Sequence, residues 1–536
     1  MLNRNNNTRS ILVVMALGLL VGVFVNLITE NIALKRRHTV VASSKFDEVL
    51  YYLRQAYVDT INSSKVEESA IVSMMDELDP HSQYISVEEF NAVNDPLLGS
   101  FEGIGVQFRI VEDTVAIVNT IKGGPSEKVG IMAGDRIVYV NDSLIAGVKI
   151  QNDSVMRLLK GPKGTKVRVK NYRRGVEGLL DFTITRDVIP TYSVDVAYML
   201  DDQTGYIKLS KFSATTYKEF LAAARQLEKQ GMKRLVFDLR GNTGGYLSAA
   251  VEIADEFLPK GNMVVFVEGR VRPRSAYYAK RKGLFEQMPV AVLIDGESAS
   301  ASEIVAGALQ DNDRGVIVGR RSFGKGLVQE QLALSDGSAI RLTVARYYTP
   351  TGRCIQKPFN GNKEDYLMES LERYGNGELF SADSIHFADS LKYYTPKGKV
   401  VYGGGGIMPD VYVPLVDDST EYFFNRIVNL GILYQYAFDY CDRHRQQLAQ
   451  YKTVEAFAAS FRVTDTMFAE LLAQAEKKGI KGSDKEKAVA RKETNTLLKS
   501  YIARNLFDEA GFYPIYRSMD DILLKALEVL SSFPSP

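Results

Sequence analysis

Cysteine and histidine are scarce in this sequence. Only two of its 536 residues are cysteines, Cys354 and Cys441, and neither belongs to a C-x-x-C or a Cys/His spacing. A disulfide scaffold and a zinc ribbon are therefore excluded, while the question whether the two cysteines pair stays open. The four histidines are scattered along the chain, so no H-E-x-x-H or similar metal-ligating cluster can be written. We expect neither a metal nor a cofactor.

The chain also lacks a marked net charge. Lys and Arg total 66 and Asp and Glu total 65, which leaves a formal charge of +1 and no electrostatic reason to bind nucleic acid. The apolar share of 45% and the charged share of 24% are ordinary for soluble globular proteins. At about 100–200 residues per domain, this length predicts roughly three to five domains.

One segment near the start of the chain has no charged residue at all. Residues 11–29 are apolar and follow Arg4 and Arg9. At about 1.5 Å per residue, a helix of this length spans roughly 28 Å, close to the thickness of a bilayer core. A cleaved signal peptide is the alternative, but the one candidate cleavage site, Val41-Ala42-Ser43, is a poor match. We expect a single-pass membrane anchor, although the basic residues 35–37 beyond it oppose the positive-inside orientation.

Periodicity divides the rest of the chain and predicts a mixed α/β protein. Residues 44–96 show helical spacing, and residues 97–187 show short β-rich runs between glycine and proline turns, with one helix at 153–159. Residues 188–415 alternate strand and helix, which predicts crossover units and a mainly parallel sheet. Within that stretch, residues 361–400 look like an insertion and 411–413 like a return to the sheet. Residues 416–536 are helical.

The first chemically informative segment surrounds Ser300. An apolar strand at 290–294 leads through a turn of small residues into an apolar helix, and Ser300 stands where that helix begins. Backbone N–H groups are unpaired there and the helix dipole is positive, so the Ala301 amide could hold an oxyanion. The alternative is that Ser300 only caps the helix, with Glu303 as the partner in a capping box.

The second segment places Lys325 between two glycines, ahead of a strand. Lys325 and Gln329 are four residues apart, so on an extended strand they share a face and the glutamine could orient the amine. Gly319-x-x-x-x-Gly324-Lys325 nearly matches a nucleotide-binding P-loop. That match fails because Gly326 replaces Ser or Thr and a strand follows where a helix is required.

The third segment is a strand at 235–239 that enters the turn G-N-T-G-G at 241–245. Its glycines allow a close approach of backbone to ligand, and ligands of open α/β sheets bind at the ends of strands. The alternative is a tight connection without a functional role.

Together these segments resemble the carboxy-terminal processing peptidases, or tail-specific proteases, over residues 45–415. The motifs that carry the resemblance are L-D-P-H-S-x-Y at 78–84, D-L-R-x-N-x-G-G at 238–245, S-A-S-A-S-E at 298–303 and F-G-K-G-x-V-Q at 323–329. The resemblance implies a crotonase-like core in which Ser300 attacks a peptide carbonyl. It implies that Lys325 deprotonates the Ser300 hydroxyl and that Gln329 positions the lysine. It implies an oxyanion hole from the amides of Ala301 and of Gly244 or Gly245. It places Glu303 and Asp311 just behind these groups.

The histidine inventory agrees with a lysine base. None of the three segments contains a histidine, so a Ser-His-Asp arrangement has no local base. A lysine can serve only if its pKa falls from about 10.4 to about 7–8, a shift of roughly 4 kcal/mol that requires removal from water.

Residues 101–108 and 124–141 resemble a bacterial PDZ domain, which binds the C-terminal tail of a polypeptide along a strand edge. The resemblance implies a carboxylate-binding loop of Gly103, Ile104, Gly105 and Val106. It implies a side-chain pocket lined by Val155 and by Leu158 or Leu159, since those two leucines cannot both face the groove.

We therefore expect a serine endopeptidase that cleaves polypeptides near their C-termini, anchored in a bacterial inner membrane with its catalytic body in the periplasm. An inactive PDZ scaffold that binds C-termini is the alternative. The C-terminal helices match no motif, and the sequence leaves open whether they brace the sheet, form homo-oligomers or bind an adaptor.

Overall fold

We analysed a computed structural model of the chain, which describes residues 44–416 and 422–533. The proposed anchor at 11–29 lies outside the described residues, so it stays a prediction. Among the described residues, no helix is both long enough and apolar enough to span a bilayer. The chain divides into two compact units, residues 1–78 and residues 79–536.

In the described part of the first unit, residues 44–78, the chain forms two helices, as the spacing of its apolar residues predicts. Helix α2 (Lys45–Ala56) is capped by Ser44, which accepts the Asp47 N–H, and α3 (Ser63–Asp76) is capped by Asn62, which accepts the Lys65 N–H. Of these helical residues only Met75 is buried.

In the second unit, residues 100–190 form a β-rich domain on a two-stranded neck. The neck pairs β2 (Ser100–Gly103) with β9 (Asp187–Pro190), antiparallel. The domain's antiparallel sheet has the order β3-β4-β5-β7-β8, with β6 beside β5, so β3 is an edge strand. The elements are β3 (Val106–Val111), β4 (Thr114–Thr120), α5 (Pro125–Lys128), β5 (Arg136–Val140), β6 (Ser143–Leu144), α6 (Asn152–Leu159), β7 (Lys166–Tyr172) and β8 (Leu179–Thr185). The predicted strands and helix are confirmed.

The core of the second unit is a six-stranded sheet in which every pairing is parallel except that of β10 with β11. This confirms the predicted, mainly parallel sheet and the return of the chain after the insertion. In sheet order the strands are β10 (Val194–Met199), β11 (Thr204–Leu209), β12 (Arg234–Asp238), β15 (Val290–Ile294), β16 (Val316–Gly319) and β21 (Val411–Tyr412).

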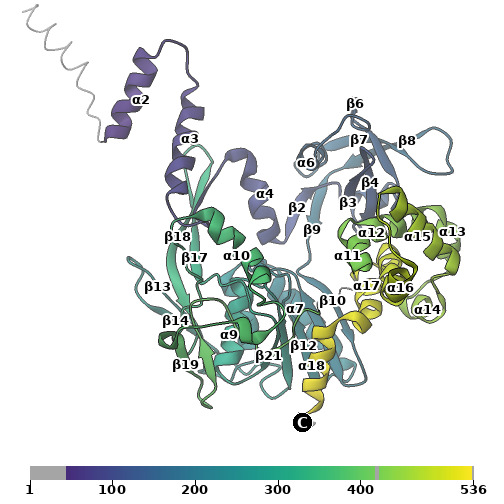
Figure 1. Cartoon of the computed structure of the whole chain (residues 1–536). Helices are drawn as coiled ribbons and strands as arrows, with labels where there is room; N and C mark the ends of the chain where they lie inside the picture. Colours follow the sequence, from purple (N-terminus) through teal and green to yellow (C-terminus); the bar gives the residue numbers. More distant parts are fainter. Residues whose placement is uncertain (1–43, 417–421, 534–536) are drawn as a thin grey trace, which may run out of the picture. The chain divides into compact units, whose positions relative to one another are not determined.

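Helices cover both faces of this sheet because its central strands are apolar on both sides. On β12, Leu235 and Phe237 pack with helices α7 (Thr216–Lys229), α8 (Leu247–Asp255) and α9 (Ala301–Asp311). Val236, between them, points to the opposite face, since side chains alternate along a strand. That face is covered by α18 (Asp521–Ser531), the last helix of the chain, drawn in yellow in Figure 1.

A second sheet carries one wall of the site. Its order is β1-β18-β13-β14, with β17 also paired antiparallel to β18 as a hairpin. Its strands are β1 (Gln83–Ile85), β13 (Met263–Glu268), β14 (Ser275–Tyr278), β17 (Leu327–Ala333) and β18 (Ala339–Tyr348). Helix α4 (Val87–Leu98) follows β1. Residues 361–400 hold α10 (Lys363–Gly375), two 3-10 turns (Ala382–Ser384 and Asp389–Leu391) and β19 (Lys392–Tyr394), which pairs with β20 (Val400–Tyr402).

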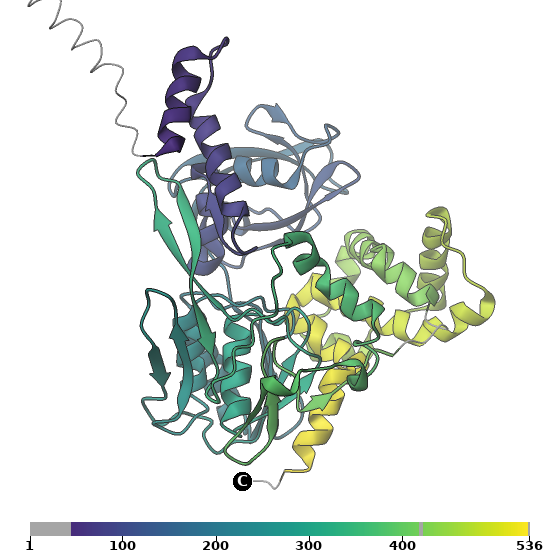
Figure 2. The same ribbon diagram turned by 60° about the vertical axis from the view of Figure 1, so that its left-hand side comes forward.

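The C-terminal helices form a separate hydrophobic cluster, as predicted for a helical region. They are α11 (Tyr422–Asn429), α12 (Ile432–Arg443), α13 (Arg445–Leu448), α14 (Val454–Ser460), α15 (Asp465–Lys477), α16 (Asp484–Phe507) and α17 (Glu509–Tyr516). A 3-10 turn (Arg517–Met519) then leads into α18, which leaves the cluster and returns to the main sheet (Figure 2).

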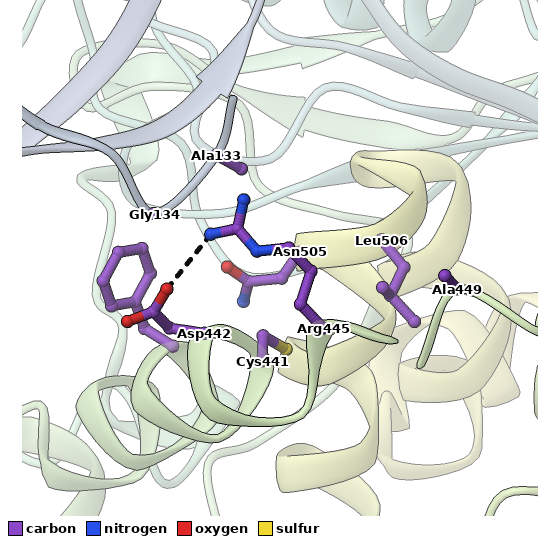
Figure 3. Close-up of a pocket in the computed structure, with 9 residues that line it drawn as sticks. Ala133, Gly134, Cys441, Asp442, Arg445, Ala449, Asn505 and Leu506 are labelled. Atoms are coloured by element: carbon purple, nitrogen blue, oxygen red, sulfur yellow. Dashed lines mark hydrogen bonds and ion pairs between the residues drawn. The ribbon is translucent and has the colours of Figure 1, made fainter. Parts of the chain in front are cut away.

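These helices contact the β-rich domain on β3 and around the Gly134 turn. The Arg109 guanidinium donates to the Gln435 side chain over 2.7 Å and lies 4.8 Å from the centre of the Tyr434 ring. Around Gly134 a cavity of about 180 Å³ is lined by Asp442, Arg445 and Cys441 (Figure 3). Cys441 is free, as is Cys354, which answers the question whether they pair.

Candidate active site

Ser300 stands at the junction between β15 and α9, held in an uncommon backbone conformation. Its φ of 54° and ψ of −113° place a non-glycine residue at positive φ, a conformation that persists only when its surroundings enforce it. Two contacts do so: its N–H donates to Glu303 Oε2 over 2.8 Å, and its carbonyl accepts the Tyr347 hydroxyl over 3.1 Å. A contact with Tyr347, outside the helix, and not helix capping alone, therefore holds the backbone of Ser300 in this conformation.

The Glu303 carboxylate joins the serine to the lysine segment. Besides the Ser300 N–H, Oε2 accepts the Lys325 N–H over 2.9 Å, while Oε1 accepts the Gly324 N–H over 2.7 Å and the Ser322 hydroxyl over 2.5 Å. The side chain is fully buried. Burial raises the pKa of Glu303, and these four hydrogen bonds oppose that shift by stabilising the charged form. The predicted place of Glu303, just behind the reacting groups, is where the structure puts it.

Lys325 and Gln329 lie in contact. Lys325 Nζ donates to Gln329 Oε1 over 3.0 Å, and Gln329 Nε2 donates to the His81 carbonyl over 2.5 Å. The spacing argument is incomplete, however, because a bulge between Val328 and Gln329 shifts the register of β17 and re-aims the side chains. Burial lowers the pKa of Lys325, and the nearby Arg341 charge lowers it further, against the opposing charges of Asp79 and Glu303.

Sequence reasoning missed the part played by His81. It lies in the L-D-P-H-S-x-Y motif, which carried the family resemblance without any assigned role. Its carbonyl fixes Gln329, and its ring Nε2 lies 3.0 Å from the Tyr366 hydroxyl. Burial, and then the charge of Lys325, lower the pKa of His81 to about 4, so the ring is neutral at ordinary pH. His81 therefore contributes through its carbonyl, which fixes the Gln329 amide that contacts Lys325.

Asp79 folds the same motif onto β18. Its Oδ1 accepts the His81 N–H over 2.9 Å and the Thr343 hydroxyl over 3.1 Å, and its Oδ2 accepts the Ser82 hydroxyl over 2.7 Å. Burial alone would raise the pKa of Asp79, but the hydrogen bonds outweigh it and the pKa is lowered. The motif is thus a structural clamp whose partner strand could not be identified from spacing.

The glycine turn lies directly beside Ser300. A Cβ on Gly244 would come within 2.8 Å of Ser300 Cβ and 3.0 Å of the Ala301 nitrogen. The Gly244 N–H donates to Asn242 Oδ1 over 2.9 Å, so that amide is occupied. For the N–H groups of Ala301 and Gly245 we find no hydrogen bond to a described residue. Of the two glycines proposed for an oxyanion hole, Gly245 therefore has the open donor.

Asp311 lies at the far end of α9. Ten residues separate Ala301 from Asp311, so at about 1.5 Å per residue the two ends are roughly 15 Å apart. Its carboxylate binds the buried Arg353 guanidinium over 2.6 Å and the Thr351 hydroxyl over 2.6 Å. Asp311 therefore anchors a loop, and its expected place beside the reacting groups is wrong because a helix carries it away from Ser300.

A groove of about 270 Å³ lies between β3 and α6. Ile104, Gly105 and Val106 line it as predicted, whereas Gly103 belongs to the neck and does not. From α6 the lining residues are Met156 and Leu159. Val155 is fully buried in the domain core and does not line the groove, so its assignment to the pocket is wrong, and Met156 lines the groove instead. Of the two leucines left as alternatives, Leu159 lines the groove and Leu158 does not.

Comparison with known proteins identifies the family. The peptidase family S41 matches residues 203–368, and the PDZ domain matches residues 103–184. The chain is 36% identical to the carboxy-terminal-processing protease of Bartonella bacilliformis over 333 residues, 61% of this chain and 75% of the relative. It is 35% identical to the carboxy-terminal processing protease CtpA of Bacillus subtilis over 347 residues, 64% of this chain and 73% of the relative. The chain belongs to the carboxy-terminal processing proteases.

As a carboxy-terminal processing protease, the chain is a serine-type peptidase with a PDZ domain. A solved structure of a photosystem II D1 C-terminal processing protease aligns with 69% of this chain and 86% of its own, at 28% identity and a TM-score of 0.37, too low to support an argument from shape. Residues 423–508 match a family of unknown function, DUF8443, so the C-terminal helices gain no role from comparison.

Substitution of Gly245 tests whether the glycine turn of this carboxy-terminal processing protease contributes to turnover. We expect Gly245→Ala to lower kcat by about 10²-fold or more, the loss typical of one oxyanion donor, because a Cβ would overlap the Phe212 carbonyl at a φ of 144°. Gly296→Ala is the matched control, since no atom lies within 4 Å of its Cβ position. Steady-state kinetics of both purified variants checks this, and equal kcat values would contradict it.

Proposed function

We propose that this protease cleaves polypeptides near their C-termini with a Ser300–Lys325 dyad, and that its PDZ domain captures the tails of its substrates. The observation that carries the proposal is the Glu303 carboxylate, which accepts the backbone N–H groups of both Ser300 and Lys325. One buried group thereby sets the nucleophile and the base in a common frame. A serine that only capped a helix would not need this link to a second segment.

The proposed chemistry follows from the groups at the site. Neutral Lys325 takes the proton of the Ser300 hydroxyl as its Oγ attacks the peptide carbonyl, and the resulting oxyanion is stabilised by the N–H groups of Ala301 and Gly245. Lys325 then protonates the leaving amine, and a water molecule hydrolyses the acyl-enzyme. Gln329 holds the amine throughout, because the His81 carbonyl fixes its own amide.

The inactive-scaffold alternative requires the loss of a reacting group. Ser300, Lys325 and Gln329 are all present; Lys325 Nζ donates a hydrogen bond to Gln329, and we find no ion pair of Lys325 with a described residue. A structural lysine would gain more from a carboxylate partner, whose charge would keep its pKa high. The lowered pKa therefore favours an enzyme.

Removal of either dyad group should abolish turnover. We expect Ser300→Ala and Lys325→Ala each to reduce cleavage of an unfolded protein by about 10⁴-fold or more, with the double variant no worse than either single one. The residues act as a unit, so their effects do not add. The test is gel analysis of cleavage with thermal melts on the same samples; appreciable turnover by Lys325→Ala would remove the lysine from the base role.

The pH dependence tests the same dyad independently. Only neutral Lys325 can accept a proton, so kcat/KM should rise with pH through its lowered pKa and level off below the ordinary lysine value of about 10.4. His81, with a pKa of about 4, contributes no step in this range. Lys325→Arg is the matched control, since its guanidinium stays charged and should leave no active plateau. A profile flat from pH 6 to 10 would contradict a lysine base.

Capture of a substrate tail is supported by the groove beside β3. This strand is an edge of its sheet, so an extended peptide can add to it through main-chain hydrogen bonds. The N–H groups of Ile104 and Gly105 have no hydrogen-bond acceptor among the described residues. Two lysines line the same groove; Lys160 is paired there with Asp95 over 2.8 Å, and Lys211 is the other. Amides and a lysine beside an apolar groove suit a terminal carboxylate.

A hydrogen bond links the segment that lines the groove to the glycine turn of the proposed oxyanion hole. Lys211 lines the groove, and the next residue, Phe212, donates its N–H to the Gly244 carbonyl over 2.9 Å. A tail held in the groove therefore keeps its preceding residues at high effective concentration near Ser300. This favours cleavage near the C-terminus.

Substrate tails provide the corresponding prediction. Peptides with an apolar C-terminal residue should be cut faster than the same peptides ending in Asp or Lys. Amidation of the carboxylate should cost about 1.5–3 kcal/mol, or roughly 10- to 150-fold in binding. Met156→Ser should weaken this preference, whereas Met132→Ser, a similarly exposed methionine outside the groove lining, should not. The measurement is kcat/KM at low substrate; equal rates for acid, amide and charged ends would rule out selection by the PDZ domain.

A further inference from the structure

A buried group of charges lies at the start of the glycine turn. Asp238, at the end of β12, is fully buried and binds the Arg240 guanidinium over 2.6 Å and Lys208 Nζ over 3.3 Å. It also accepts the Tyr206 hydroxyl over 2.6 Å. Burial alone would raise the pKa of Asp238, but the charges of Arg240 and Lys208 outweigh it and hold the pKa far below its usual range. Two cations thus surround one carboxylate.

The second carboxylate comes from the opposite end of the sequence. Asp520 binds Arg240 in a bidentate pair, with both guanidinium nitrogens 2.7 Å from its two oxygens. Its side chain is 6% exposed, and that of Arg240 is 16% exposed. With Asp520, the two cations and two anions balance. Without it, a guanidinium would lose half of its compensation in a place largely closed to water, which is costly in proteins.

Asp520 is brought there by α18, which packs on the back of the main sheet. Ile522 and Leu523 of this helix join the cluster formed by Val236 and Leu293 of the central strands. Asp520 is also the cap of α18, since it accepts the Leu523 N–H over 3.0 Å. The Arg240 contact is therefore built on a rigid element, which suits a positioning role.

A connection runs from Arg240 to the proposed oxyanion hole. Lys208 Nζ also donates to the Arg240 carbonyl, and two residues later Asn242 accepts the Ala299 N–H over 3.0 Å and the Ser302 hydroxyl over 2.8 Å. Those two residues flank Ser300 and Ala301. A shift of Arg240 would thus move the turn relative to Ser300.

We propose that Asp520 is a positioning residue of the protease: through Arg240 it holds the Gly241–Gly245 turn in the geometry that stabilises the oxyanion. The inference rests on the proposed function, because it takes Ser300 as nucleophile and Gly245 as an oxyanion donor. It assigns to the last segment of the chain, beyond the region that matches the peptidase family, an indirect part in turnover through Arg240. Displacement of an oxyanion donor affects the transition state more than substrate binding, so its signature is in kcat.

The test compares Asp520→Asn with Asp521→Asn in the full chain. Asparagine still caps α18, so the first variant removes the charge and keeps the helix start. Asp521 is exposed and makes no ion pair that we find among the described residues, which makes it the matched control for charge at this helix end. We expect Asp520→Asn to lower kcat by about 10- to 100-fold with KM changed less than about threefold, Asp521→Asn to match the wild type, and Asp520→Glu to recover part of the loss.

A second measurement distinguishes slower catalysis from a smaller fraction of folded protein. The rate constant for labelling of Ser300 by a fluorophosphonate reports only on folded molecules, and it should fall in parallel with kcat. If Asp520→Asn lowered Tm but left this rate constant unchanged, Asp520 would be structural only and the inference would be overturned. An equal loss in Asp521→Asn would overturn it as well. Labelling that persisted in Ser300→Ala would instead contradict the proposed function.

Discussion

The carboxylate of Glu303 is the constraint around which the site is organised. It lies at the third residue of α9 without access to water, and all four of its hydrogen bonds come from Ser300 and the Ser322–Lys325 segment. A buried carboxylate is costly unless it is fully hydrogen-bonded, so the folded state requires both segments to be in place at once. The uncommon backbone of Ser300 follows from this requirement, because the same carboxylate draws its N–H inward. The stability of this region and the backbone conformation of the proposed nucleophile, Ser300, therefore depend on one group.

Lys325 differs from Glu303, because its surroundings disfavour its charged form. Its amine is buried beside a neutral amide, an arrangement that disfavours the charged form. Because its pKa is lower in the folded than in the unfolded state, the unfolded chain binds more protons at pH values between the two, and this group makes folding less favourable there as pH falls. The Asp79 motif and β18 fix His81 and, through its carbonyl, the Gln329 amide that contacts Lys325. The position of the buried amine therefore depends on hydrogen bonds from these neighbouring segments.

Contacts between distant segments recur throughout the second unit. The PDZ domain contacts the C-terminal helices through Arg109, and the last helix of the chain reaches the oxyanion turn through Asp520. Both contacts involve an arginine whose charge is shielded from water by aromatic or acidic partners. The helices that follow the peptidase core thus contact strand β3 of the PDZ domain and Arg240 at the start of the glycine turn.

Much of this protein was determined by its sequence alone. Alternating apolar runs predict the parallel sheet and its helices, since burial on both faces of a strand leaves a local signature at β12 and β15. The small-residue turn before α9 and the glycine-flanked Lys325 likewise indicate the proposed reacting groups, because that chemistry depends on residue types close in the chain. What the sequence could not determine were partners that meet only after folding. Gln329 meets His81 across 248 positions and Arg240 meets Asp520 across 280, and no spacing rule connects residues so far apart. Local ambiguities were also decided by tertiary contacts. Met156 lines the groove in place of Val155, because Val155 is buried in the domain core. Asn242 accepts the Gly244 N–H, whereas the Gly245 N–H has no acceptor among the described residues.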